Sequence, residues 1–233
     1  MGQNISTAVM QRRVEPHDSL DDFPTPPWAT RALMKHVIMP VVGPVADQSC
    51  WEPACNRGHM ARPLAEFFRR VDASDIHDYG WDFDGQQRVV DFLFPASTSQ
   101  MQEAQGVDWI ITNPPFRLAQ QFIARSSEIA RHGFAMIVRS AFLEGVGRFN
   151  DLFSINPPSI IAQFTERVVM VKGRLDAKGS TATAYCWLVW IDGETDTRFQ
   201  WIPPCRKALE RADDYRESPL PVLSLDPSEA LTC

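Results

Sequence analysis

An Asn-Pro-Pro-Phe sequence, Asn113 to Phe116, follows an apolar run of β-forming residues, Val107 to Thr112. This run predicts a strand, so the motif is expected at the carboxyl end of a sheet, where open α/β sheets bind ligands. Pro114 and Pro115 fix the chain and have no N–H to donate. The Asn113 side-chain oxygen and the Pro114 carbonyl therefore remain as acceptors, which match the two N–H groups of an exocyclic amine. Phe116 offers a flat face for a base.

Such an arrangement suits methylation of an aromatic amine. The amine lone pair is delocalised into the ring, and hydrogen bonds from both N–H groups favour a pyramidal nitrogen with an available lone pair. The same acceptors stabilise the positive charge that develops on nitrogen, and positioning contributes the rest. A second Asn-Pro-Pro, Asn156 to Pro158, follows a poor strand and is not followed by an aromatic residue. We interpret it as a structural turn.

Acidic residues at three other places could bind a cofactor. Glu52 precedes the tight, small-residue turn that ends at Gly58; its charge would repel a pyrophosphate and attract an ammonium group, which favours a cofactor that carries an amino acid. Asp75 ends a predicted strand and could accept hydrogen bonds from both ribose hydroxyls. Asp91 could accept one from an adenine amino group, with Phe92 stacking on the ring. Each carboxylate could also be an ordinary loop residue.

The elements that position these residues alternate between strand and helix. Thr25 is expected to cap a helix that starts at Pro26 and ends near Pro40, and a second helix is expected from His59. A further helix is expected between Leu118 and Ala130. Strands are predicted at 50–52, 71–76, 107–112, 134–138, 166–171 and 182–191, the last two joined by a Gly/Lys-rich loop. This order predicts an α/β fold, a mostly parallel sheet with helices on both faces and an antiparallel C-terminal hairpin.

The composition is that of a globular protein, with 44% hydrophobic and 22% charged residues among 233. We expect one domain at 21–205, a flexible arm at 1–20 and a C-terminal tail at 206–233. No stretch approaches the roughly 20 apolar residues of a membrane span, and no secretory signal is recognisable, so a cytoplasmic location without membrane contact is expected. The five cysteines are scattered and form no Cys-x-x-Cys, so we expect neither disulfides nor a metal site.

Taken in order, these motifs resemble those of S-adenosylmethionine-dependent DNA amino-methyltransferases, especially the small, phage-type adenine-N6 enzymes. Phe23-Pro24-Thr25-Pro26 looks like the motif on the methionine side of the cofactor. The resemblance implies a Rossmann-like class I methyltransferase fold, S-adenosylmethionine as cofactor, and methyl transfer to the N6 amine of adenine in DNA with base flipping. The catalytic residues would be Asn113, Pro114, Pro115 and Phe116. The cofactor would contact Phe23, Thr25, Pro26, Glu52, Ala54, Cys55, Asn56, Gly58, Asp75, Ile76, Asp91, Phe92 and Asn113. The family usually has Gly where this chain has Asn56, a residue that tolerates left-handed backbone.

The chain as a whole has a net charge of -6. If it binds DNA, the contact with phosphates would therefore be made by a local basic surface. Residues 165–183 carry four basic and two acidic side chains. Within them, Lys172, Arg174 and Lys178 could contact phosphates from a loop. Cytosine N4 in DNA and adenine in RNA present similar amines, and a non-catalytic relative that binds DNA or cofactor is a further alternative. The role, whether restriction-modification, phage protection or regulation, stays open.

Overall fold

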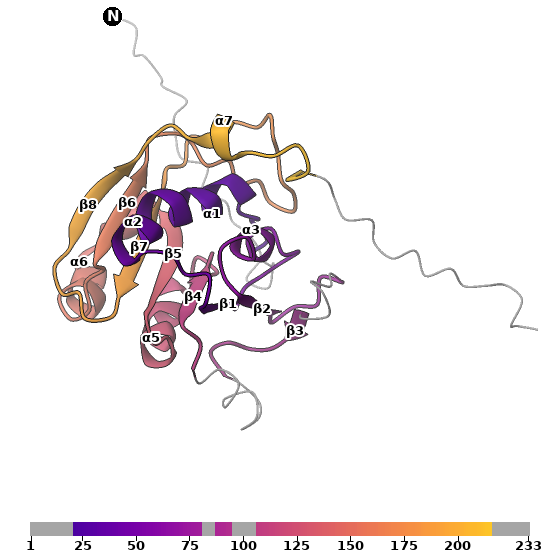
Figure 1. The fold of residues 1–233 in the computed structure, drawn as a ribbon. Coiled ribbons are helices and arrows are strands. Elements are labelled where there is room, and N and C mark those ends of the chain that lie inside the picture. The colour runs from indigo at the N-terminus through magenta and orange to yellow at the C-terminus, as the bar shows by residue number, and fades with distance from the viewer. Residues whose placement is uncertain (1–20, 81–86, 95–105, 216–233) are drawn as a thin grey trace, which may run out of the picture.

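An eight-stranded sheet runs through the centre of the molecule (Figure 1). This computed structural model describes residues 21–80, 87–94 and 106–215; the predicted arm at 1–20 lies outside them. The strands lie in the order β3-β2-β1-β4-β5-β7-β6-β8. Their bounds are β1 Ser49–Glu52, β2 Arg70–Asp75, β3 Gln87–Val89, β4 Trp109–Thr112, β5 Gly133–Arg139, β6 Ile160–Phe164, β7 Tyr185–Ile191 and β8 Arg198–Ile202.

The sheet combines a parallel half with an antiparallel insertion. Strands β3, β2, β1, β4 and β5 run parallel, whereas β7 runs antiparallel to both β5 and β6, and β8 pairs parallel with β6. The predicted α/β architecture with an antiparallel hairpin is therefore confirmed. Because neighbouring parallel strands end at the same edge, the residues that follow β1, β2 and β4 come together there.

Helices cover both faces of the sheet. Alternate residues of β4 and β5 belong to two apolar clusters: Ile111 and Ile137 pack with one set of helices, and Ile110 and Met136 with the other. The first set comprises α1 Pro27–Leu33, η1 Met34–Ile38 and α3 Ala61–Leu64; the second comprises α5 Ala119–Ile129 and η3 Phe149–Phe153. The short elements α2 Met39–Val42, η2 Ser140–Leu143, α6 Val146–Arg148 and α7 Arg206–Leu209 complete the fold.

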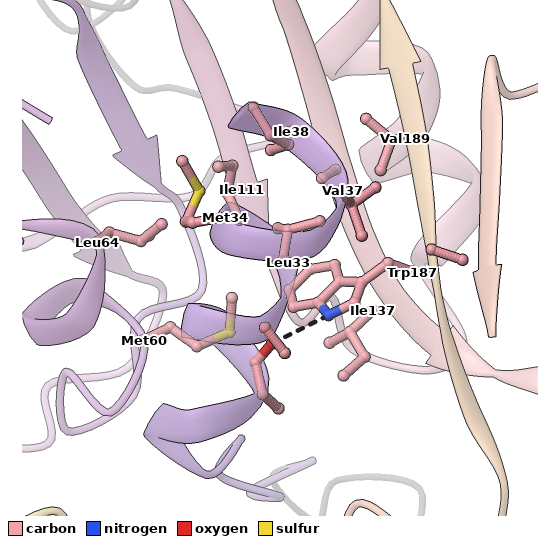
Figure 2. Packing of buried hydrophobic residues seen from close by; sticks show 14 of the residues in the cluster. Leu33, Met34, Val37, Ile38, Met60, Leu64, Ile111, Ile137, Trp187 and Val189 are labelled. Carbon is pink, nitrogen blue, oxygen red and sulfur yellow. Dashed lines mark hydrogen bonds between the residues drawn. The ribbon is translucent and has the colours of Figure 1, made fainter. Parts of the chain in front are cut away.

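Helix α1 crosses in front of the sheet (Figure 1). Its buried face and that of η1 pack on β5 and β7; Figure 2 shows Leu33 and Val37 beside Trp187 and Ile137. The Trp187 indole N–H also donates to the Ala29 carbonyl, 3.3 Å away. This packing fixes the start of α1, and with it the segment that precedes it, relative to the sheet.

The start and end of the first helical region differ from the sequence prediction. Pro26, not Thr25, occupies the N-cap, and no side chain caps α1. Instead of ending near Pro40, the helical path continues through the π-helical turn η1 into α2 and ends before Gly43, whose φ of 83° terminates it. A proline is tolerated inside this path because it lies in the first turn of α2, directly after the π-helical turn.

One strand prediction near the C-terminus was wrong, and two strands, β6 and β8, were not predicted. Residues 166–171 form no ladder strand; Val168, Val169 and Met170 are buried in the core without strand pairing. The strand that pairs with β7 is β6, which lies just before them, and β8 was not predicted because four of its five residues are exposed or half-buried. The helix expected from His59 is only the short α3.

Residues 206–215, the first part of the predicted tail, pack against the domain. Leu209 is buried in the α1 cluster, and Asp214 accepts hydrogen bonds from the Arg31 guanidinium at 2.8 Å. Glu66 completes this ion-pair group from the segment after α3. Among the helices of the described ranges, none combines the length and apolarity that a membrane span requires.

Candidate active site

Asn113, the first residue after β4, has its side chain oriented by a residue far away in the sequence. Its Nδ2 donates to the Phe23 carbonyl at 2.8 Å and lies 3.9 Å from the Met170 sulfur. Its Oδ1 is buried and has no hydrogen-bond partner among the described residues. A buried acceptor without a partner is costly, and such atoms mark places where a ligand can supply the missing donor.

Phe116 lies between two neighbours. Its ring centroid is 5.4 Å from that of Phe23, and the Arg139 guanidinium carbon lies 4.1 Å from the ring centroid. The backbone N–H of Phe116 donates to the Asp21 carboxylate at 2.6 Å. The turn closes with a bond from the Leu118 N–H to the Pro115 carbonyl, 2.9 Å long.

The segment before α1 connects the two predicted loops. Asp22 accepts from the Asn56 side chain at 2.7 Å and forms an ion pair with Arg57 at 3.1 Å, while its carbonyl accepts from the Gly173 N–H at 2.8 Å. Asp21 and Phe23 hold the Asn-Pro-Pro-Phe turn, as described above. The predicted cofactor loop and the predicted catalytic loop are therefore fixed to the same few residues.

Glu52, the last residue of β1, is almost fully buried. Burial, and then the nearby charge of Asp75, raise the pKa of its carboxyl well above the usual range, while a hydrogen bond from the Ala61 backbone opposes the shift. Its Oε2 is buried without a partner among the described residues. A carboxylate in this state gains from a cationic ligand, which would both neutralise its charge and fill its empty acceptor.

The turn after Glu52 is held by backbone bonds and two left-handed residues. Cys55 N–H donates to the Ser74 carbonyl at 2.9 Å and Gly58 N–H to the Cys55 carbonyl at 2.7 Å, and Ala54 lies half-buried just before them. Gly58 has a φ of 74°, and Asn56 has a φ of 51°, the one positive value at a non-glycine residue in the described ranges. Asn56 thus adopts the backbone that its place in the motif requires.

Asp75 ends β2 beside this turn and is buried. Its Oδ2 accepts from the Asn56 N–H at 2.9 Å and its Oδ1 from the His77 N–H at 3.0 Å. Burial raises the pKa of Asp75, and these backbone bonds partly counteract it. Each carboxylate oxygen can accept a second bond. The neighbouring Ile76 side chain is 64% exposed, an apolar surface next to an acceptor.

Asp91 and Phe92 follow β3 and have different surroundings from those expected. The Asp91 Oδ1 caps a turn by accepting from the Leu93 and Phe94 N–H groups, at 2.9 and 3.2 Å. Phe92 is buried, with its ring 5.2 Å from that of Trp51 and 4.8 Å from that of Phe122. Phe92 thus fills the apolar core, which leaves little of its ring for stacking on a cofactor.

The predicted DNA-contacting loop lies beside the Asn-Pro-Pro-Phe turn. Met170 contacts Asn113, and the Gly173 N–H donates to the Asp22 carbonyl. Lys172, Arg174 and Lys178 come next to or after these two residues in the chain, and all three are exposed. Arg174 forms an exposed ion pair with Asp176 at 3.5 Å. The start of this loop therefore lies beside the Asn-Pro-Pro-Phe turn, although the loop does not join two ladder strands as predicted.

Several site residues were missed by sequence reasoning: Asp21, Asp22, Arg57, Arg139 and Met170. The position of Asp21 and Asp22 next to Phe23, and of Arg57 within the predicted turn beside Asn56, could have indicated these three. Arg139 and Met170 lie far along the chain from the groups they touch, and no spacing rule links them. In the described ranges, no three His, Cys, Asp or Glu side chains are grouped closely enough to hold a metal ion.

Solved structures with a similar fold include two restriction-modification proteins. A type I restriction-modification methyltransferase subunit from Streptococcus thermophilus superposes with a TM-score of 0.57 and 11% identity, covering 77% of this chain and 47% of that one. A modification subunit assigned to a type I restriction enzyme from Vibrio vulnificus gives a TM-score of 0.51 and 16% identity over the same shares. The chain thus spans about half the length of each.

A protein from Lactococcus lactis described as a hemolysin also matches, with a TM-score of 0.51 and 11% identity over 78% of this chain and 93% of that one. At these identities the likeness shows the fold alone, and the same fold carries different functions. Scans against family models and against curated proteins find no match. The chain therefore has the Rossmann-like class I methyltransferase fold, and its chemistry has to be argued from the site.

Proposed function

We propose that this protein transfers a methyl group from S-adenosylmethionine to the exocyclic N6 amine of adenine in DNA. The observation that carries the proposal is the Asn113 carboxamide, whose nitrogen is held by the Phe23 carbonyl while its buried oxygen has no partner among the described residues. An acceptor fixed in this way is suited to an N–H group of an incoming amine.

Residues at the carboxyl ends of β1 and β2 fit the cofactor. S-adenosylmethionine supplies an electrophilic methyl group on a positively charged sulfur. The buried, unpartnered Oε2 of Glu52 suits the ammonium of its amino-acid part, and the remaining acceptor capacity of Asp75 suits the ribose hydroxyls. Ile76 offers an exposed apolar face to the adenine ring. Asp91 is the acceptor we assign to the adenine amino group.

The Asn-Pro-Pro-Phe turn positions the target amine. Asn113 Oδ1 and the Pro114 carbonyl accept its two N–H groups, which draws the nitrogen toward a pyramidal form and stabilises the charge it gains. The Phe116 ring holds the base by stacking. Pro114 and Pro115 keep the loop rigid, so the acceptors do not have to reorganise when the base arrives.

The choice of DNA as the substrate rests on three observations. An aromatic ring beside paired acceptors suits a nucleobase. The exposed Lys172 and Arg174 flank Gly173, which is bonded to Asp22 near the turn, and Lys178 lies farther along the same loop; these side chains could contact phosphates. Two proteins with the same fold are restriction-modification subunits. A base within a duplex must be extruded before its amine can reach Asn113.

The test is to incubate the protein with methyl-tritiated cofactor and unmethylated genomic DNA, and to analyse the labelled nucleosides by mass spectrometry. We expect N6-methyladenine. Label in N4-methylcytosine would correct the target base, label in RNA or protein would overturn DNA as the substrate, and no transfer to any of them would overturn the enzymatic proposal.

Asn113→Ala tests the proposed acceptor, because it removes the carboxamide and leaves the turn. We expect the rate of transfer to fall about 10²- to 10³-fold, as for other preorganised electrostatic groups, while cofactor affinity stays within a few-fold of the wild type. Asn156→Ala is the matched control from the second Asn-Pro-Pro, where the backbone N–H donates to the Leu152 carbonyl and the backbone carbonyl accepts from the Trp190 indole, so the substitution leaves both bonds in place. Equal activity of the two variants would contradict the role of Asn113.

A further inference from the structure

Arg139 is the last residue of β5 and lies over the ring of the catalytic turn. Its guanidinium carbon is 4.1 Å from the Phe116 ring centroid. Because β4 and β5 are parallel neighbours and β5 continues past Met136, the partner of Thr112, Arg139 extends beyond the end of β4 and lies alongside the turn that follows it. The Arg139 side chain is exposed, and no carboxylate of the described residues pairs with it. Within these ranges, the Phe116 ring is the group that the guanidinium contacts.

The Phe116 ring is held from two sides, whereas no hydrogen bond or ion pair of the Arg139 side chain is found among the described residues. Asp21 fixes the backbone N–H of Phe116, and the buried Phe23 packs against its ring. The backbone of Arg139 is fixed by its pairing with Tyr185 of β7, which leaves its side chain as the movable part. Since Phe23 is buried and Arg139 exposed, we take the face of Phe116 under Arg139 to be the one that a base can reach from solvent.

We propose that Arg139 covers the stacking face of Phe116 when no nucleic acid is bound, and that the extruded base displaces the guanidinium onto a backbone phosphate of the target strand. The inference rests on the proposed function. An exposed guanidinium gains less from an aromatic face than a stacked base does, so the exchange favours the base. The displaced guanidinium finds in phosphate an anion that it binds in two-pronged geometry.

If this exchange takes place, Arg139→Ala changes the affinities for two ligands in opposite directions. The uncharged base 9-ethyladenine competes with the guanidinium and gains nothing from a phosphate contact, so its affinity is expected to rise several-fold. Duplex DNA loses one phosphate contact, so its affinity is expected to fall about tenfold, and the slope of log K against log salt is expected to become less negative by about 0.9. Both titrations use saturating S-adenosylhomocysteine, which keeps the base out of the cofactor site.

Two further variants complete the experiment. Arg139→Lys keeps the charge, and we expect it to retain the wild-type salt slope for DNA. Arg198→Ala is the control: it removes an exposed arginine on β8, at the far edge of the sheet, and we expect it to change neither affinity. Unchanged affinities in Arg139→Ala, or weaker binding of 9-ethyladenine, would overturn the inference. Failure of the proposed function is distinguishable, because the wild type would then transfer no methyl group to DNA.

Discussion

Glu52 is a buried acid whose burial costs stability as long as no ligand neutralises its carboxyl. Its carboxyl is buried at the end of β1, with an oxygen that has no partner in the described ranges and a pKa raised mainly by burial. In the unfolded chain the same carboxyl is ionised at neutral pH. The folded state must either bury the charge or take up a proton, and both cost free energy. A cationic ligand would remove this cost.

Glu52→Gln is expected to stabilise the protein and weaken cofactor binding. A group whose folded pKa is raised contributes stability that is full below its unfolded pKa and is lost as pH rises toward the folded value. The variant should therefore gain little near pH 4 and on the order of 1–3 kcal/mol near pH 7, where about 1.4 kcal/mol corresponds to each pKa unit. Urea unfolding at several pH values measures the first effect and calorimetric titration of S-adenosylmethionine the second.

Two results would contradict this account of Glu52. If the variant and the wild type have the same free energy of unfolding from pH 4 to pH 7, the carboxyl is not destabilised by burial. If the variant binds S-adenosylmethionine as tightly as the wild type, the ammonium group is not the partner of Oε2, even where the stability prediction holds.

At the scale of elements, α1 is the part that positions the site, because the segment before it holds both loops. Its buried Arg31 donates to Glu66 after α3 at 2.9 Å, and to Asp214 and the Leu209 carbonyl, at 2.8 and 2.9 Å. The Arg31 and Asp214 side chains are 5% and 3% exposed. These bonds join α1 to two other segments in a desolvated environment, where removal of one partner leaves a buried charge.

Arg31→Met is expected to lower the free energy of unfolding by about 3–5 kcal/mol, because it leaves Asp214 buried without its counter-ion. Arg70→Met is the matched control: its ion pair with Asp72 is exposed, and its loss should cost less than about 1 kcal/mol. Denaturant unfolding of both variants measures the difference. Similar values for the two would mean that the buried ion pairs do not anchor α1.

On the scale of the whole molecule, the C-terminal residues up to 215 take part in the same packing as the sheet and its helices. Leu209 is in the apolar cluster of α1, and Glu166, just after β6, accepts from the backbone N–H groups of Cys205 and Arg206, at 2.5 and 2.8 Å. The core therefore draws on both ends of the described chain. We therefore expect folding of the site to depend on the contacts of residues 206–215.

Deletion of residues 206–233 is expected to destabilise the protein much more than deletion of residues 216–233. The longer deletion removes Leu209 from the core and Asp214 from Arg31, so it should cost at least about 3 kcal/mol beyond the shorter one. Thermal and urea unfolding of the two truncated chains measure this difference. Equal stabilities would show that α7 and Asp214 contribute nothing to the domain.

Much of this organisation was predictable from local sequence. The apolar strands around residues 50, 73, 110, 136 and 188 and the amphipathic helix after Leu118 gave the right element types, since burial on a sheet imposes a local pattern. The tight turn at Asn56 and Gly58 and the end of a strand directly before Asn113 were also placed correctly along the chain. The prediction failed for 166–171, where an apolar run packs in the core without pairing, and for the exposed strand β8.

The sequence by itself determined which groups stand at the ends of which strands, because strand periodicity and turn residues act over a few neighbours. Only the tertiary structure decided how these groups are oriented. The Phe23 carbonyl that turns Asn113, the Asp21 carboxylate that holds Phe116, and the Arg139 guanidinium over its ring come from segments brought together by the crossing of the chain over the sheet. Such contacts depend on the path of the whole backbone, which no local propensity encodes.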